Sequence, residues 1–229
     1  ANSGTKWSDC MKKKGSAVFH KNTFDKISPE KKDKIFTVAI AEFAAMGYNA
    51  TNINMIAQKA DISIGSLYSY FSSKEDLFLA MAEKGYELLG KALAELHPEE
   101  GTVFDVIERL LHITVNYAEQ HTDFCLIYID LSTETLSGLS ERLSDNVETD
   151  YVNAYKELLA AAKEKGEVRS DLDVPMAAFF LDNLVVMLQL SVASSYYRSR
   201  IKLYLGEDGA QDREMLIGGL LALIKRAFS

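Results

Sequence analysis

Apolar residues recur along most of the chain at the three- and four-residue spacing of amphipathic helices. The first clear segment opens with Ser28-Pro29-Glu30, an N-cap residue followed by proline and by an acidic residue in the first turn. Its apolar face consists of Ile35, Ala39, Phe43 and Met46. Gly47 follows, and glycine commonly ends a helix. The pattern therefore predicts a helix over residues 28–46.

Two short helices and one long helix are predicted next. Thr51 or Asn52 caps the first short helix, whose apolar face comprises Ile53, Ile56, Ala57 and Ala60. After a tight turn, Ser63 caps the second, which carries Leu67, Tyr68 and Phe71. Ser73-Lys74-Glu75-Asp76 has the spacing of a capping box and opens a helix that runs to about Leu96.

The remainder of the chain repeats the helical pattern, and no alternating strand pattern competes with it. The further helices are predicted over residues 102–120, 123–135, 140–165, 174–205 and 210–228. The fold class is therefore all-α, and we expect three parts. They are a basic N-terminal extension (1–27), a three-helix domain (28–73) and a helical C-terminal domain (74–229) whose first helix, 74–97, links the two.

The segment 47–78 carries a specific motif. It resembles the TetR family of bacterial repressors, in which G-x-x-x-T precedes I-A-x-x-A and then S-x-G-x-L-Y-x-x-F-x-x-K-E-x-L. The matching residues are Gly47, Thr51, Ile56, Ala57, Ala60, Ser63, Gly65, Leu67, Tyr68, Phe71, Lys74, Glu75 and Leu77. The resemblance implies a helix-turn-helix over 53–71 in a dimeric transcriptional repressor that binds a palindromic operator and is released by a small-molecule effector.

The second short helix is the expected reading helix for double-stranded DNA. Gly65 has no side chain, so the helix N-terminus with its free N–H groups can approach a phosphate closely. Hydroxyl, phenol and apolar side chains around it can contact phosphates, base edges and thymine methyl groups. The predicted DNA-binding residues are Thr51, Asn52, Ser63, Ile64, Gly65, Ser66, Tyr68, Ser69, Tyr70 and Lys74.

Three features depart from the family pattern. Asp61 occupies the turn where glycine is usual, and aspartate tolerates the left-handed conformation better than most residues. Tyr70 replaces a common histidine. No lysine or arginine lies between Lys59 and Lys74, so bidentate arginine readout of guanine is absent from the reading helix. We therefore expect an A·T-leaning operator, with much of the affinity supplied by Lys26, Lys31, Lys32 and Lys34.

Charge is distributed unevenly along the chain. The whole sequence has a net charge of −8, yet residues 1–34 contain nine lysines and only four acidic residues. This asymmetry favours one phosphate-binding end, although a solvated tail would show the same composition.

Residues 176–193 are the most apolar stretch, but Asp182, Asn183 and Gln189 interrupt it, which favours a buried helix over a membrane span. With two cysteines and no signal-peptide pattern, we expect a cytoplasmic protein.

The C-terminal helices predict a homodimer. The helices 174–205 and 210–228 are apolar on most faces, and five C-terminal helices are too few to cover them. A four-helix interface formed by these two helices from each subunit is therefore expected, and Gly218-Gly219 would permit close helix approach there. The alternative is that they form the core of a monomer.

Polar and aromatic residues on the middle helices are candidates for an effector pocket. Asp130 and Asp182 lie inside apolar runs, where a carboxylate needs a cationic partner or neighbouring donors. The candidate pocket residues are His112, Asn116, Tyr117, Phe124, Tyr128, Asp130, Tyr151, Tyr155, Asp182 and Met187, although all of them also fit an ordinary core. His121 and Cys125 have the spacing of a metal-ligand pair, but no third ligand is evident, so we expect no metal and no cofactor.

Two other classes of function stay open. An all-α enzyme using His112 and Asp130 is one, although no nucleotide-binding, metalloprotease or hydrolase motif occurs. A DNA-binding protein without an effector is the other.

In the preferred mechanism the effector tilts the 74–97 helix and changes the distance between the two reading helices of the dimer.

Overall fold

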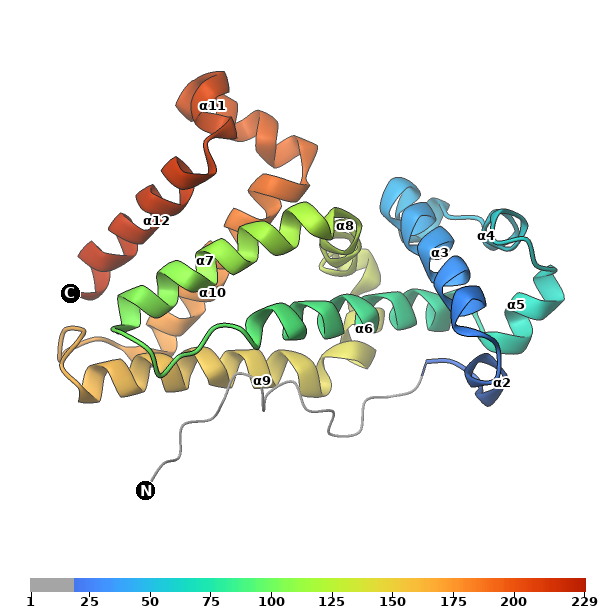
Figure 1. Ribbon diagram of the computed structural model, residues 1–229, viewed down its shortest axis with the longest axis horizontal. Helices are drawn as coiled ribbons and strands as arrows, with labels where there is room; N and C mark the ends of the chain where they lie inside the picture. The colour runs from blue at the N-terminus through green and yellow to red at the C-terminus, as the bar shows by residue number, and fades with distance from the viewer. Residues whose placement is uncertain (1–18) are drawn as a thin grey trace. The chain divides into compact units, whose positions relative to one another are not determined.

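The computed structural model describes residues 19–229, apart from the side chains of 144–148 and 150. Within that range the secondary structure is helical, with no strand, so the predicted all-α fold is confirmed (Figure 1). The elements are α2 (Asn22–Asp25), α3 (Pro29–Ala50), α4 (Ile53–Lys59), α5 (Ile64–Tyr70), α6 (Lys74–Leu93), α7 (Val103–Gln120), α8 (Thr122–Leu131), the 3₁₀ turn η1 (Glu134–Leu136), α9 (Ser137–Glu164), α10 (Val174–Ala193), α11 (Ser195–Gln211) and α12 (Arg213–Phe228).

The described chain divides into two compact units. We call residues 19–87 and 123–145 the head unit, and residues 88–122 and 146–229 the body unit. The head unit thus contains α2–α5, most of α6, α8, η1 and the start of α9. The predicted domain boundary after residue 73 stays a prediction.

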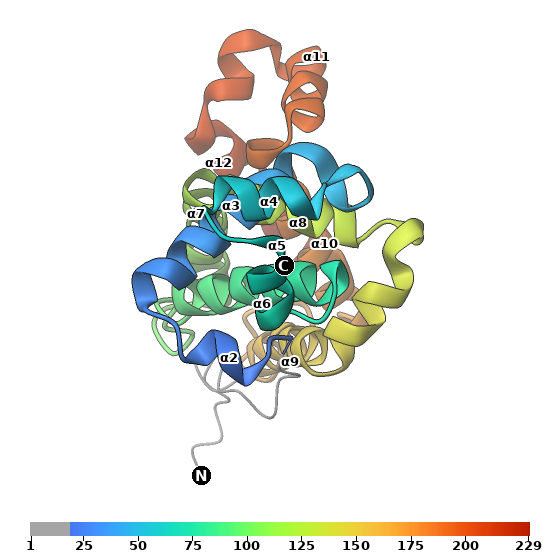
Figure 2. The same cartoon turned by 90° about the vertical axis from the view of Figure 1, so that its right-hand side faces the viewer.

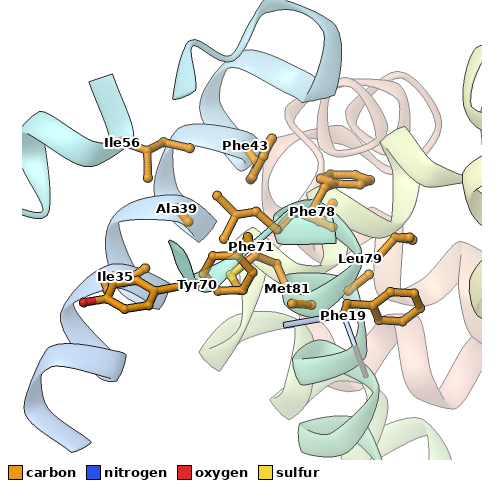
Figure 3. Close-up of a cluster of buried hydrophobic side chains, with 14 of the residues drawn as sticks. Phe19, Ile35, Ala39, Phe43, Ile56, Tyr70, Phe71, Phe78, Leu79 and Met81 are labelled. Atoms are coloured by element: carbon orange, nitrogen blue, oxygen red, sulfur yellow. The ribbon is translucent and has the colours of Figure 1, made fainter. Parts of the chain in front are cut away.

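Aromatic and aliphatic side chains from α3, α4, α5 and α6 form the core of the head unit (Figure 3). Ile35 and Phe43 of α3 and Ile56 of α4 are almost completely buried, as their helical spacing predicted. Phe43 packs edge-on against Phe78 of α6, with ring centroids 5.0 Å apart. The predicted helix end at Gly47 is confirmed locally, because this residue has φ +72° and interrupts the regular α3 conformation.

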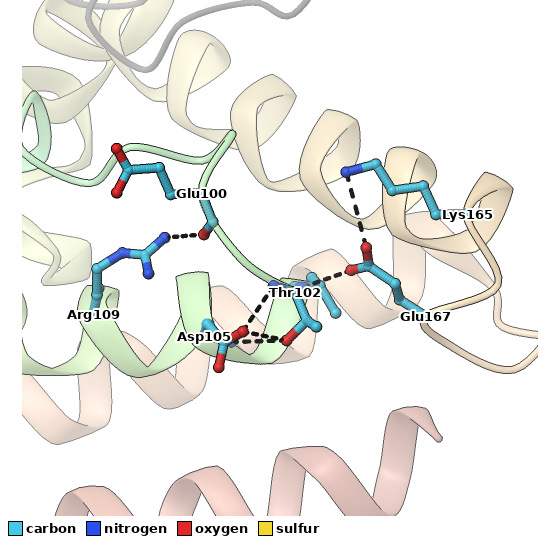
Figure 4. Close-up of polar contacts among 7 residues, drawn as sticks. Glu100, Thr102, Asp105, Arg109, Lys165 and Glu167 are labelled. Carbon is cyan, nitrogen blue, oxygen red and sulfur yellow. Dashed lines mark hydrogen bonds and ion pairs between the residues drawn. The ribbon is translucent and has the colours of Figure 1, made fainter.

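The body unit is built around α7, which packs against α10 and α12 (Figure 1). A capping box opens α7: Thr102 accepts a hydrogen bond from the Asp105 amide, and the Asp105 carboxylate accepts one from the Thr102 amide (Figure 4). Glu167 accepts a 2.6 Å hydrogen bond from the Val103 amide. Arg109 donates to three carbonyls of the preceding loop. These contacts fix where α7 begins.

The prediction of one continuous helix over residues 174–205 is wrong, because the helix is interrupted within that range. α10 ends at Ala193, Ser194 is extended (φ −91°, ψ 129°) and α11 begins at Ser195. Arg198 donates to the carbonyls of Val192 and Ala193, which the end of α10 leaves without helical partners. No glycine or proline marks the break, so the sequence pattern did not reveal it. Gly206, the predicted stop, has φ +74° within α11.

Smaller corrections concern three other elements. The predicted helix 123–135 ends at Leu131 and is followed by η1, and α9 begins at Ser137 instead of residue 140. The short helix α2 was not predicted.

By length and composition α10 is apolar enough to cross a membrane, but half of its most apolar window is buried in the protein, and a core helix passes the same test.

Candidate nucleic-acid interface

The turn between α4 and α5 has the geometry of a helix-turn-helix. Asp61 adopts the left-handed conformation (φ 59°), which confirms that aspartate can replace glycine in this turn. The Ile62 amide donates to the Ala57 carbonyl (3.0 Å), so the end of α4 is closed by a hydrogen bond across the turn. Ala57, Ala60 and Leu67 are buried and hold the two helices together.

The N-terminal half of α5 is exposed and polar; α4 and α5 face the viewer in Figure 2. Ser63 is the N-cap, and its hydroxyl accepts a 3.0 Å hydrogen bond from the Ser66 amide. Ile64 and Tyr68 are 36% and 44% exposed, which is high for such apolar side chains. Ser69 is also exposed, and its hydroxyl donates to the Ser66 carbonyl. This part of the predicted reading surface is accessible.

Gly65 has no structural reason to be glycine. Its φ is not in the left-handed region, and a Cβ built on it meets only the Ser63 hydroxyl, at 3.8 Å. Such a distance is ordinary van der Waals contact. Neither backbone conformation nor packing within the described residues therefore requires glycine at this position.

Two predicted DNA-binding side chains are mostly buried. Tyr70 is 7% exposed, and its ring lies 5.8 Å from that of Phe24, so it belongs to the head-unit core (Figure 3). Thr51 is 4% exposed, and its hydroxyl donates to the carbonyl of Gly47 at 2.7 Å. Both side chains therefore contribute little to the exposed surface, and the prediction that they contact DNA stays a prediction. Asn52 remains exposed as the N-cap of α4.

Lys74, the predicted phosphate clamp, contacts backbone carbonyls of the protein. Its ammonium donates to the carbonyls of Thr51 (2.7 Å) and Asn49 (3.3 Å) and lies 4.8 Å from the centre of the Tyr48 ring. Burial lowers the pKa of Lys74, while the negative charge of Asp130 opposes that shift. The ammonium thus supports the connection between α3 and α4, and its predicted role as a phosphate clamp stays a prediction.

Lysines of α3 lie close to the reading helix or to α2 and the turn beside it. The Lys31 ammonium is 5.5 Å from the centre of the Tyr70 ring, and that of Lys32 is 5.6 Å from the Phe24 ring. Lys34 forms an exposed ion pair with Asp61 in the turn (3.6 Å). The described lysines of the basic N-terminal segment therefore lie beside α5. Residues 1–18 of that segment lie outside the described residues.

The predicted pocket residues are divided between the two units. Phe124, Tyr128 and Asp130 belong to the head unit, and the other seven belong to the body unit. The Asp130 carboxylate accepts a 2.5 Å hydrogen bond from the Tyr48 amide, which the interruption of α3 at Gly47 leaves free. A neighbour within the head unit thus satisfies this carboxylate, as the alternative interpretation expected, and the prediction that Asp130 faces a cationic effector stays a prediction.

The body-unit candidates differ widely in exposure. Tyr117 and Tyr155 are buried, while Tyr151 and Asp182 are half-buried. Met187 is 43% exposed and Asn116 is also exposed. His112 is partly exposed, with Nδ1 3.8 Å from a Glu214 carboxylate oxygen. Their grouping into one pocket stays a prediction.

Large apolar side chains are exposed on the last three helices of the body unit. They are Met176, Phe179, Phe180 and Met187 of α10, Tyr196, Leu203, Tyr204 and Leu205 of α11, and Met215 and Leu223 of α12. Phe179 and Phe180 are 59% and 55% exposed, which is unusual for phenylalanine in a monomer.

Comparison with known proteins agrees with this geometry. Residues 35–81 match the family model described as "Bacterial regulatory proteins, tetR family", which covers α4, α5 and parts of α3 and α6. The chain is 27% identical over 157 residues to the HTH-type transcriptional repressor NicS of Pseudomonas putida KT2440, covering 67% of this chain and 73% of that protein.

Solved structures share the fold over most of the chain. A TetR family transcriptional regulator from Chloroflexus aurantiacus has a TM-score of 0.68 and 22% identity, covering 91% of this chain and 98% of its own. The transcriptional regulator FadR from Bacillus subtilis, solved in complex with stearoyl-CoA, has a TM-score of 0.65 and 19% identity, covering 84% and 96%. Both similarities extend beyond the family-model match into the C-terminal helices.

Proposed function

We propose that this chain, which belongs to the TetR family of bacterial regulatory proteins, is a dimeric repressor. In this proposal α5 reads a palindromic operator, and the C-terminal helices bind a small-molecule effector. The observation that carries the proposal is the exposed N-terminal face of α5, where Gly65 serves no purpose within the protein. The proposed DNA contacts are Asn52, Ser63, Ile64, Gly65, Ser66, Tyr68 and Ser69.

The chemistry of this face favours an A·T-leaning operator. Residues 60–73 contain no lysine or arginine, so guanine readout by a charged side chain is absent. Ile64 and Tyr68 offer apolar surface to thymine methyl groups, and Ser69 offers a hydroxyl. Lys26, which follows α2, and the lysines of α3 would then contribute phosphate contacts, which carry affinity but little sequence information.

Dimerisation follows from the exposed apolar residues of α10 and α12. Phe179, Phe180 and Met215 would be covered by the same helices of a second copy. An added Cβ at Gly218 or Gly219 meets nothing within 4 Å, so both glycines leave space for a partner helix. Two reading helices held about 34–36 Å apart could then enter successive major grooves.

We propose that the effector acts through α6, which begins in the head unit and ends in the body unit. Binding of the effector in the body unit would tilt this helix and change the distance between the two reading helices. Operator binding would then weaken, with a coupling free energy between effector and operator of roughly 1–3 kcal/mol. The solved relative with stearoyl-CoA bound makes acyl thioesters the first class of compound to test.

The experiment selects binding duplexes from a random-sequence pool with the purified protein. The proposal expects recovery of an A·T-rich inverted repeat whose half-sites lie one helical turn apart. Acyl-CoA compounds of increasing chain length, aromatic acids and apolar cations are then tested for release of the selected duplex. Recovery of no common sequence would contradict the repressor proposal. A selected palindrome that no compound releases would favour the constitutive DNA-binding protein.

A further inference from the structure

The C-terminal end of α5 is closed by residues that precede α3. In any α-helix the last four carbonyls lack partners within the helix, and in α5 these belong to residues 67–70. Leu67 accepts from the Phe71 amide (3.0 Å). The other three accept from the segment before α3: Tyr68 from the Lys21 ammonium (2.8 Å), Ser69 from the Thr23 hydroxyl, and Tyr70 from the Lys21 amide (2.7 Å). Every one of the four carbonyls is therefore satisfied.

Aromatic packing anchors the same segment. Phe24 of α2 is 3% exposed, and its ring centroid lies 4.9 Å from that of Phe71 and 5.1 Å from that of Phe36. Phe19 is also buried, with the Arg142 guanidinium 5.7 Å from its ring centre (Figure 3). These core contacts attach the segment to the head unit, and its hydrogen bonds to α5 add to them.

A helix as short as α5 needs such external support. It has seven residues, and isolated helices of that length are unstable in water. Its last turn contains no basic residue to interact with the negative end of the helix dipole. Lys21 supplies that charge from outside the helix, and Thr23 supplies a second donor. The support acts on the end opposite to Gly65, so it leaves the proposed DNA face open.

We propose that residues 19–26 are a strap that positions α5 for DNA, and that Lys21 and Thr23 are positioning residues for sequence-specific operator binding. The strap lies outside the segment 35–81 that matches the family model. The proposal rests on the proposed function for its DNA-binding part. The packing of the strap on α5 can be tested without DNA.

The experiment uses two pairs of variants of the full chain. Thr23→Val and Lys21→Met remove a donor from α5, while Thr37→Val and Lys26→Met make the same chemical changes at exposed positions on α3 and at the end of α2. Lys21 and Thr23 are exposed, so the variants leave the buried core intact. Lys21→Arg restores a cationic donor. Circular dichroism verifies that each variant is folded.

The first readout is amide hydrogen exchange followed by NMR, without DNA. The amide at position 21 reports the strap directly, because it donates to Tyr70. In Thr23→Val this amide and that of Phe71 are expected to exchange about fivefold faster, the effect of losing one hydrogen bond of ordinary net strength. Thr37→Val should leave both rates unchanged. Unchanged rates in Thr23→Val would overturn the strap.

The second readout compares affinity for the selected duplex with affinity for a scrambled duplex of the same length. Thr23→Val should weaken binding to the selected duplex by roughly five- to tenfold and leave the scrambled duplex unaffected, because no charge is lost. Lys21→Met should lower the ratio of the two affinities, and Lys21→Arg should restore it. Lys26→Met should weaken both duplexes equally. Equal weakening of both by Lys21→Met would make Lys21 a phosphate contact and overturn its positioning role.

The two proposals fail in different ways. Should the wild-type protein select no duplex, the repressor proposal fails, and the exchange measurement alone decides whether the strap holds α5. Should the wild type select a duplex that Thr23→Val and Lys21→Met bind with unchanged specificity, the repressor proposal stands and the positioning role fails.

Discussion

Substitution of Gly65 should affect the stability of the protein and its affinity for DNA in opposite directions. Gly65 lies in the first turn of α5, where a Cβ would meet only the Ser63 hydroxyl at 3.8 Å. Gly65→Ala should therefore fold normally. Alanine is favoured over glycine in a helix by up to about 1 kcal/mol, so the free energy of unfolding should rise slightly.

Operator binding should change in the opposite direction. If the N-terminus of α5 contacts a phosphate through its free N–H groups, a methyl group at this position moves the helix away from it. A hydrogen bond to a charged group contributes about 1.5–3 kcal/mol, so its loss would weaken binding roughly 10- to 100-fold. Gly65→Gln, with a longer side chain of good helix propensity, should weaken it at least as much.

The assay is fluorescence anisotropy with the selected duplex at fixed salt, paired with thermal unfolding followed by circular dichroism. Gly138→Ala provides the matched control, because it adds a methyl group to an exposed helical glycine that has nothing within 4 Å. That control should bind the duplex as the wild type does. Gly65→Ala with increased stability and undiminished affinity would refute the assignment of this face to DNA.

Three further predictions concern salt, assembly and pH. Replacing the lysines beside α5 with alanine should reduce the slope of log affinity against log salt by about 0.9 for each phosphate that the protein no longer neutralises, and an unchanged slope would exclude these lysines from phosphate binding. Those lysines are Lys26, Lys31, Lys32 and Lys34. Phe179→Glu combined with Phe180→Glu should convert the proposed dimer to a monomer in sedimentation velocity, whereas Val152→Glu, an exposed apolar position on α9, should not. Hydrogen bonds from the backbone and side chain of Thr102 lower the pKa of Asp105, so the α7 cap stabilises the fold above the ordinary carboxyl pKa and is lost as pH falls through the lowered value. Asp105→Ala should therefore flatten the acid limb of the stability–pH curve, and an unaltered limb would show that the cap contributes nothing.

The sequence by itself determined the helix-turn-helix. The spacing of Ile53, Ile56 and Ala60 is local information, since residues three and four apart share a helix face whatever surrounds them. The turn at Asp61 and the cap at Ser63 also depend on neighbouring residues alone. Gly65 could be proposed as a DNA contact because a glycine in a helix needs an explanation, and the structure shows no internal one.

Only the tertiary structure decided which polar side chains of this region stay exposed. Tyr70 turns inward because Phe24, distant in sequence, completes an aromatic cluster around it. Lys74 and Asp130 bond to backbone groups that the interruption of α3 leaves free. Helical periodicity shows which residues share a face of a short helix, but a residue at the edge of that face becomes buried only when a distant segment packs over it.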